Sequence, residues 1–167
     1  SMEVLHLLKK AGYTPKRTLR AVMFMNEENG MRGGNEYAQQ ATKKGEQHVF
    51  ALESDAGGFT PRAFTFDCTD AAFKQIKSWE PLFDPYLAIQ MYRGGGGADI
   101  GPLKPQGGVL SGLRPDSQRY FDYHHAETDT FDAINPRELA LGAAAMTSLI
   151  YLADTYGFEG KLRKAEQ

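Results

Sequence analysis

Short apolar runs that end in turn residues alternate along this chain with segments of helical periodicity. The runs predicted as strands are Thr18–Met25, His48–Glu53, Leu87–Tyr92 and Val109–Leu113. Runs that are apolar at consecutive positions are typical of strands that helices cover on both faces. The alternation therefore predicts an α/β protein with three α/β/α layers and a mostly parallel mixed sheet.

The intervening segments carry apolar residues at helical spacing, over Met2–Ala11, Asn35–Lys44 and Asp70–Trp79. A last helix begins after Asn135, which can cap it, and Glu138 stands where a capping box places a carboxylate. We expect this helix to bury one apolar set, namely Leu139, Ala143, Met146, Ile150 and Leu152.

Length and composition predict one globular domain over residues 1–167. The 19 basic and 21 acidic side chains give a net charge of −2, which offers neither nucleic acid nor an anionic membrane a basic surface. No apolar run reaches the roughly 18 residues that span a bilayer, so we expect no membrane segment. The single cysteine, Cys68, is interpreted as a small buried side chain.

Polar side chains gather where the predicted strands end. Glu27 and Glu28 follow the first strand, Asp55 follows the second, and the pair His124–His125 precedes the last helix. In sheets of this kind, ligands bind at the carboxyl ends of the strands. Carboxylate and imidazole are ligands that zinc takes, and hydrolysis needs a further carboxylate that is not a ligand. Each cluster taken alone is more often a solvated turn, a cap or a packing site.

Four segments taken together resemble the co-catalytic di-zinc exopeptidases, most of all the branch similar to plasma glutamate carboxypeptidase, and also the bacterial leucyl aminopeptidases. Asn26–Gly34 resembles their (N/G)EE-x-G-x-x-G segment, and Ala51–Gly57 resembles their strand-end aspartate. Gly95–Leu103 is similar to their glycine-rich substrate loop, and Tyr120–Thr130 to their histidine motif. The segments occur in family order over almost the whole chain. Ala126 departs from the pattern, because a threonine usually follows the ligand histidine.

The resemblance implies a role for each matching residue. Glu27 would be the general base that activates water and then protonates the leaving amine. Glu28 and His125 would be terminal ligands of one zinc, and Asp55 a terminal ligand of the other. From its position one helical turn after His125, Asp129 would orient the histidine ring with its carboxylate. The substrate-binding candidates are Gly96, Gly97, Asp99 and Tyr123.

The family pattern also has a first histidine and a bridging aspartate, in motifs that would precede Ser1. We therefore interpret residues 1–167 as a partial peptidase domain, lacking its first strands and metal-ligand motifs. We expect this chain alone to bind at most one zinc and to have little activity. Because early strands are missing, we expect association, either as a homo-oligomer or by pairing with the missing N-terminal segment.

The resulting expectation is a zinc exopeptidase acting on peptides or dipeptides, as an aminopeptidase or as a dipeptidase or carboxypeptidase. A non-catalytic half-domain that serves binding or assembly is the alternative. An acyl transferase of the glutaminyl cyclase type is the less favoured third interpretation. Relatives are commonly exported, but the sequence does not indicate a compartment.

Overall fold

The computed structural model describes residues 1–85 and 88–159. Within those residues lies one four-stranded sheet in the order β1-β4-β2-β3. β1 runs parallel to β4, and β2 runs parallel to β3, whereas the central pair β2 and β4 is antiparallel. The predicted mixed sheet is confirmed. Its strands are β1 (Phe50–Glu53), β2 (Pro61–Asp67), β3 (Gln90–Arg93) and β4 (Val109–Pro115).

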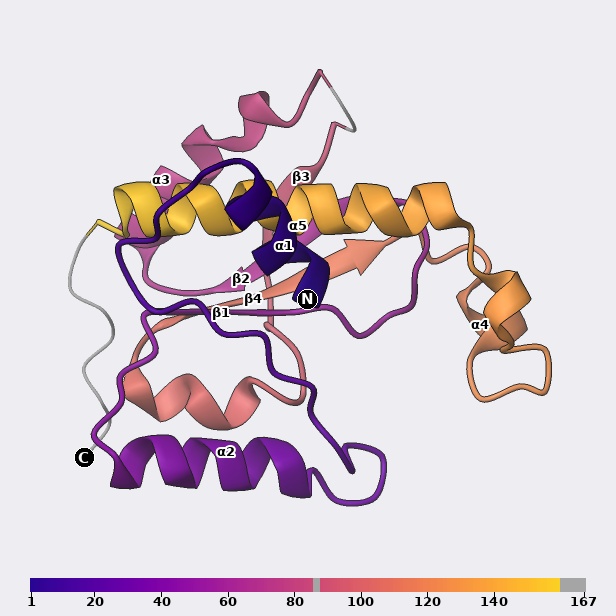
Figure 1. The fold of residues 1–167 in the computed structure, drawn as a ribbon, viewed down its shortest axis with the longest axis horizontal. Helices are drawn as coiled ribbons and strands as arrows, with labels where there is room; N and C mark the ends of the chain where they lie inside the picture. Colours follow the sequence, from indigo (N-terminus) through magenta and orange to yellow (C-terminus); the bar gives the residue numbers. More distant parts are fainter. Residues whose placement is uncertain (86–87, 160–167) are drawn as a thin grey trace.

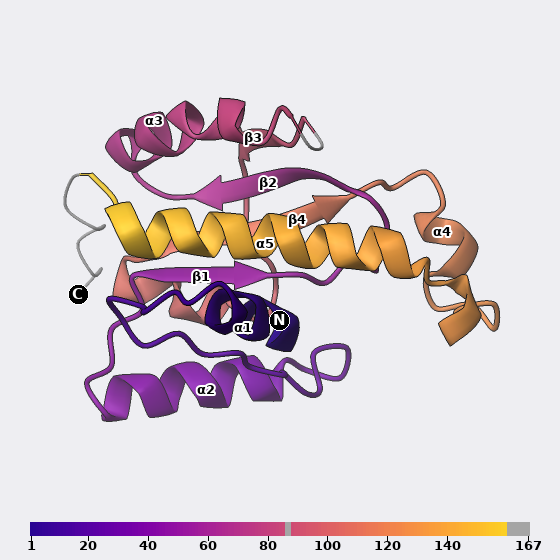
Figure 2. The same ribbon diagram turned by 45° about the horizontal axis from the view of Figure 1, so that its top comes forward.

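Helices cover both faces of the sheet, which confirms the predicted three layers. Figures 1 and 2 show α1, α3 and α5 on one face, and α2 with the 3₁₀ helix η2 on the other. The short α4 lies beyond the end of the sheet, in the segment that enters α5. The helices are α1 (Met2–Lys10), α2 (Arg32–Lys43), α3 (Asp70–Ser78), η1 (Glu80–Leu82), η2 (Gly101–Gln106), α4 (Tyr120–Tyr123), η3 (Phe131–Ala133) and α5 (Pro136–Tyr156).

Each face of the sheet has its own apolar core. The larger core joins α1, α3 and α5 to the sheet, and Phe64, Ile76 and Leu149 are fully buried in it. The smaller core packs Ala38 of α2 and Leu103 of η2 against the other face. Burial of apolar area on both faces is the main force that holds the layers together. Among the described helices, α5 is long and apolar enough to cross a bilayer by length and composition, and here it packs on α1, β2 and β4.

Two strand predictions are wrong. Thr18–Met25 was expected to be a buried strand, but it is extended without sheet pairing, and the Met25 side chain is 77% exposed. A strand needs a hydrogen-bonded neighbour, which an apolar run cannot guarantee. The central strand β2 was not predicted, although Phe64, Phe66 and Cys68 alternate with polar residues as a strand requires.

The other strands and the helices are confirmed within a few residues. Leu87, the predicted start of one strand, lies outside the described residues, and β3 begins at Gln90. The Asn135 carboxamide oxygen accepts hydrogen bonds from the backbone of Arg137 and Glu138, at 2.8 and 3.4 Å, so the predicted cap of α5 is confirmed. The prediction that Leu139 is buried is wrong, because it is 53% exposed near the helix start.

Candidate metal and catalytic site

The two adjacent glutamates project from a tight turn between the extended segment and α2. The carbonyl oxygen of Glu27 accepts hydrogen bonds from the backbone of Gly30 and Met31, at 3.2 and 3.0 Å. Asn26 and Met31, on either side of the pair, have φ angles of 67° and 54°. This left-handed conformation costs a non-glycine residue about 1–2 kcal/mol, so the surrounding structure must hold the turn in place. Such strain occurs often at functional sites.

The structure brings Glu28 together with His125, although 97 residues separate them in the chain. Glu28 Oε1 lies 2.9 Å from His125 Nε2, and both side chains are about three-fifths exposed. His125 itself has a left-handed backbone, with φ of 55°. Its ring stacks on that of His124 at 3.9 Å between centroids, and His124 stacks on Tyr120 at 4.6 Å. A stack of three rings therefore supports the side chain that faces Glu28.

Glu27 lies beside this pair in a field of negative charge. Partial desolvation, followed by the charges of Glu28, Asp55 and Asp99, raises the pKa of the Glu27 carboxyl, and His125 opposes the rise. A carboxylate with a raised pKa holds a proton more readily near neutral pH. That property suits a group that must accept a proton and later return it.

Asp55 lies two residues after the end of β1, in the predicted place, and is exposed. It lines a pocket of about 130 Å³ between the end of β1 and the loop that carries His125. The predicted substrate residue Tyr123 lines the same pocket and packs on Phe59, with 5.8 Å between ring centroids. Asp129 also lines it, whereas the ring of His125 has its hydrogen-bonding contact with Glu28. The orienting role of Asp129 therefore stays a prediction.

Glu53 was not singled out from the sequence, yet it fixes the glycine-rich loop. Its carboxylate is buried and accepts a hydrogen bond from the backbone of Ile100 at 3.0 Å. A Cβ atom at Gly97 would lie 2.2 Å from the Glu53 carboxyl carbon, so only glycine fits there. Burial raises the pKa of Glu53, and the charges of Asp99 and Asp55 add to the effect of burial. The sequence signal was a carboxylate that ends an apolar strand two residues before Asp55.

Gly96 and Asp99 lie in the same loop. Gly96 is buried, and a Cβ atom there would meet Ile100 and Leu110, so its close packing positions the loop. Asp99 has a buried Oδ1 atom without a hydrogen-bond partner among the described residues. Desolvation, with the charge of Asp55, raises its pKa. Whether these residues contact a substrate stays a prediction.

The Glu28–His125 pair fits one zinc ion, judged by its donor atoms and their separation. Ligands at about 2.0–2.1 Å in tetrahedral geometry stand roughly 3.3 Å from each other, close to the 2.9 Å found here. Across residues 1–85 and 88–159, no group of three or more histidine, cysteine, aspartate or glutamate side chains is arranged to hold a metal. The site thus offers one ligand pair, and Asp55 does not complete a three-ligand group with it among the described residues.

Known proteins resemble this chain over almost its whole length. The profile of peptidase family M28 matches residues 1–150. Carboxypeptidase Q of Bos taurus and that of Homo sapiens are each 32% identical over 152 residues, which is 91% of this chain and 32% of each relative. The chain therefore spans about a third of the length of these relatives.

Two solved structures share the fold. A peptidase M28 precursor from Shewanella amazonensis SB2B is 31% identical, with a TM-score of 0.79, over 92% of this chain and 35% of that chain. LapA of Legionella pneumophila is 18% identical, with a TM-score of 0.63, over 92% of this chain and 45% of the other, and supports the fold alone. By sequence and fold the chain is similar to metallopeptidases. More particularly, the chain belongs to peptidase family M28.

Proposed function

We propose that this chain carries part of the active site of a zinc-dependent exopeptidase, within a single partial peptidase domain. The contact between Glu28 and His125, with Glu27 beside it, is the observation that supports this most directly. The carboxylate and the imidazole would hold one zinc ion, and Asp55 would serve a second. Bound zinc in such a site supplies Lewis acidity toward water and the scissile carbonyl.

Glu27 would perform the proton transfers. Its carboxylate is adjacent to the proposed ligands and forms no ion pair within the part of the chain that the structure describes, so it remains available to a water molecule. It would accept a proton from that water as the water attacks the peptide carbonyl. It would then donate the proton to the departing amine nitrogen. The neighbouring negative charges favour the protonated intermediate state of Glu27.

We propose a peptide or dipeptide as the substrate. The pocket beside Asp55 has the aromatic walls Phe59, Tyr120 and Tyr123, which suit a single side chain at the end of a peptide. Aminopeptidase and dipeptidase or carboxypeptidase activities both agree with this arrangement.

A non-catalytic half-domain is the second candidate, favoured by the absence of a three-ligand group in the part of the chain that the structure describes.

Zinc titration of the chain, by competition with a chelating dye, tests the proposed site. We expect at most one weakly bound zinc, because one imidazole and one carboxylate form the pair. Glu28→Gln and His125→Asn should each abolish this binding, and His6→Asn, on the exposed side of α1, should leave it unchanged. Unchanged binding in the first two variants, or two tightly held zinc ions in the unmodified chain, would contradict the proposal.

Hydrolysis assays separate the two candidates. Dipeptides and amino-acid p-nitroanilides should be cleaved slowly by this chain alone, and faster where the zinc site is complete. Any cleavage should fall about 10²–10⁴-fold in Glu27→Gln, with zinc binding retained. Zinc binding without hydrolysis under any condition would support the half-domain instead.

We also propose that the chain associates with a second copy of itself through the open side of β1. Among residues 1–85 and 88–159 this strand pairs with β4 on one side only, and unpaired strand edges favour pairing with another chain. Sedimentation should give a dimer at micromolar concentration. A monomer over the whole accessible concentration range would contradict this.

A further inference from the structure

The loop that carries His125 is anchored at its two ends rather than along its length. Residues 124–132 are all exposed, so little packing holds them. The direction of the His125 ring must therefore be set where the loop leaves β4 and where it enters α5. We propose that Glu138, in the first turn of α5, is a positioning residue that acts through Arg119 to hold His125 against Glu28. This inference rests on the proposed function.

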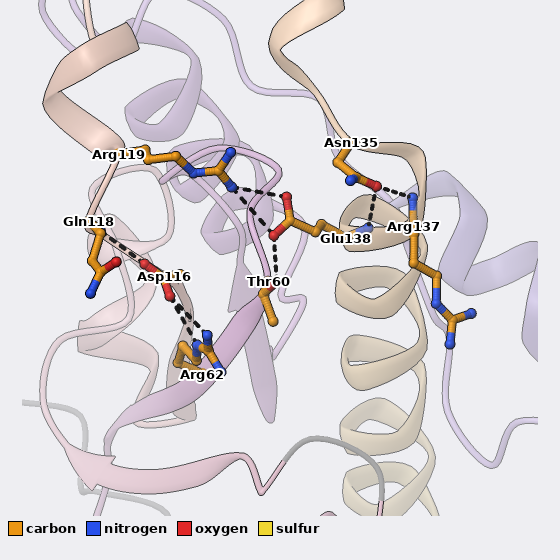
Figure 3. A network of polar contacts seen from close by, with 8 residues as sticks. All are labelled: Thr60, Arg62, Asp116, Gln118, Arg119, Asn135, Arg137 and Glu138. Carbon is orange, nitrogen blue, oxygen red and sulfur yellow. Dashed lines mark hydrogen bonds and ion pairs between the residues drawn. The ribbon is translucent and has the colours of Figure 1, made fainter.

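Glu138 joins three elements through its carboxylate (Figure 3). Oε1 accepts a hydrogen bond from the Thr60 hydroxyl at 2.5 Å, and Oε2 pairs with Arg119 Nη2 at 3.2 Å. Thr60 immediately precedes β2, and Arg119 immediately precedes α4. The Arg119 guanidinium also lies 4.7 Å from the ring centroid of Phe59, which is buried. One carboxylate thus ties both ends of the loop to the central sheet.

A second set of contacts fixes the first end of the loop. Asp116 accepts hydrogen bonds from the Arg62 side chain, and its backbone N–H donates to the Thr60 carbonyl at 2.8 Å. Asp116 also accepts from the backbone of Gln118 at 3.0 Å. These contacts bring Arg119 to Glu138 but do not reach beyond it. A link from this anchored end to His125 therefore starts at Arg119, beside the separate contact of Tyr123 with Phe59.

The ring stack provides that link. Tyr120 follows Arg119 directly, and its ring stacks on His124 with 21° between the planes. His124 stacks in turn on His125, with 27° between the planes. A displacement of Arg119 would move Tyr120 and so tilt the stack that supports His125. The path is short and contiguous, which is the physical requirement for such coupling.

Glu138→Gln and Arg119→Gln test the inference, with Glu46→Gln as the matched control. Glu46 also pairs with an arginine, Arg20, at 3.0 Å, but the pair joins the extended segment to the end of α2. The first readout is the His125 ring signal in NMR spectra of the metal-free chain. The second readout is zinc affinity, measured by dye competition. Thermal unfolding shows whether each variant is still folded.

We expect both loop variants to shift or broaden the His125 signal and to weaken zinc binding by about tenfold. The double variant should weaken it by less than the two single effects combined, because both changes remove the contact between Arg119 and Glu138. Glu46→Gln should leave both readouts at the level of the unmodified chain. An unchanged His125 signal in Glu138→Gln, or an equal change in Glu46→Gln, would overturn the inference. If the unmodified chain binds no zinc, the proposed function fails, and the metal-free His125 signal still decides the positioning role.

Discussion

Asp154 is a buried carboxylate on α5 that holds the segment after α1. It is 4% exposed and accepts hydrogen bonds from Tyr13 Oη at 2.8 Å and from the backbone of Lys16 at 2.7 Å. Arg17 lies 3.4 Å from its other oxygen. Desolvation pushes the pKa of Asp154 upward, but these donors outweigh it and hold the pKa below its usual value. An acidic residue within an apolar helix face was the sequence signal for this contact.

We expect Asp154→Asn to destabilise the chain at neutral pH by about 1.5–3 kcal/mol, the range for hydrogen bonds to a buried charge. A folded-state pKa below the unfolded value of about 3.9 gives stability that is present above that value. That stability is lost as pH falls through the folded pKa. The difference between the two chains should therefore shrink below about pH 4. Urea unfolding at pH 7 and pH 3 measures it, with exposed Asp84→Asn as control, and a pH-independent difference would contradict the expectation.

At the scale of elements, helices could be predicted better than strands. The helical spacing of apolar residues and the Asn135 cap depend only on residues close together in the sequence. The four long helices were therefore located to within a few residues. Strand assignment depends on a partner elsewhere in the chain, which explains the error at Thr18–Met25. The candidate site likewise depends on contacts between residues far apart in the chain. The resemblance named Glu28 and His125, but their contact depends on the left-handed backbone at His125. The resemblance gave Glu53 no role, and the capping position of Glu138 gave no sign of its contacts with Thr60 and Arg119.

The start of α2 packs directly on the loops of the candidate site. A Cβ atom at Gly34 would lie 2.7 Å from the carbonyl oxygen of Asp99. Alanine is ordinarily better than glycine inside a helix by roughly 0.5–1 kcal/mol. We expect the opposite sign for Gly34→Ala, a loss of about 1–3 kcal/mol from overpacking against backbone. Gly101→Ala, where a Cβ atom meets open space, is the control. Denaturant unfolding compares the two, and equal stabilities would contradict the prediction.

For the whole molecule, the sheet ends at β1, and beyond it the chain leaves a cleft of about 490 Å³. The extended segment from Arg17 to Phe24 lines one side of this cleft, and β1 lines the other. Two neighbouring strands would lie about 4.8 Å apart, with no room for a cleft between them. The three layers are therefore complete over β4 and β2 and open at β1.

Hydrogen exchange tests whether residues 18–24 are unpaired with β1. The amides of residues 18–24 make no backbone hydrogen bonds to β1 in the described part of the chain, so they should exchange much faster than those of β2 and β4. Protection that rises with protein concentration would mean that a second copy pairs at this edge, in agreement with the proposed association. Slow exchange at every concentration would mean that the segment pairs with β1 inside one chain. The cleft would then be closed in solution, and the sheet would have one strand more than the structure assigns.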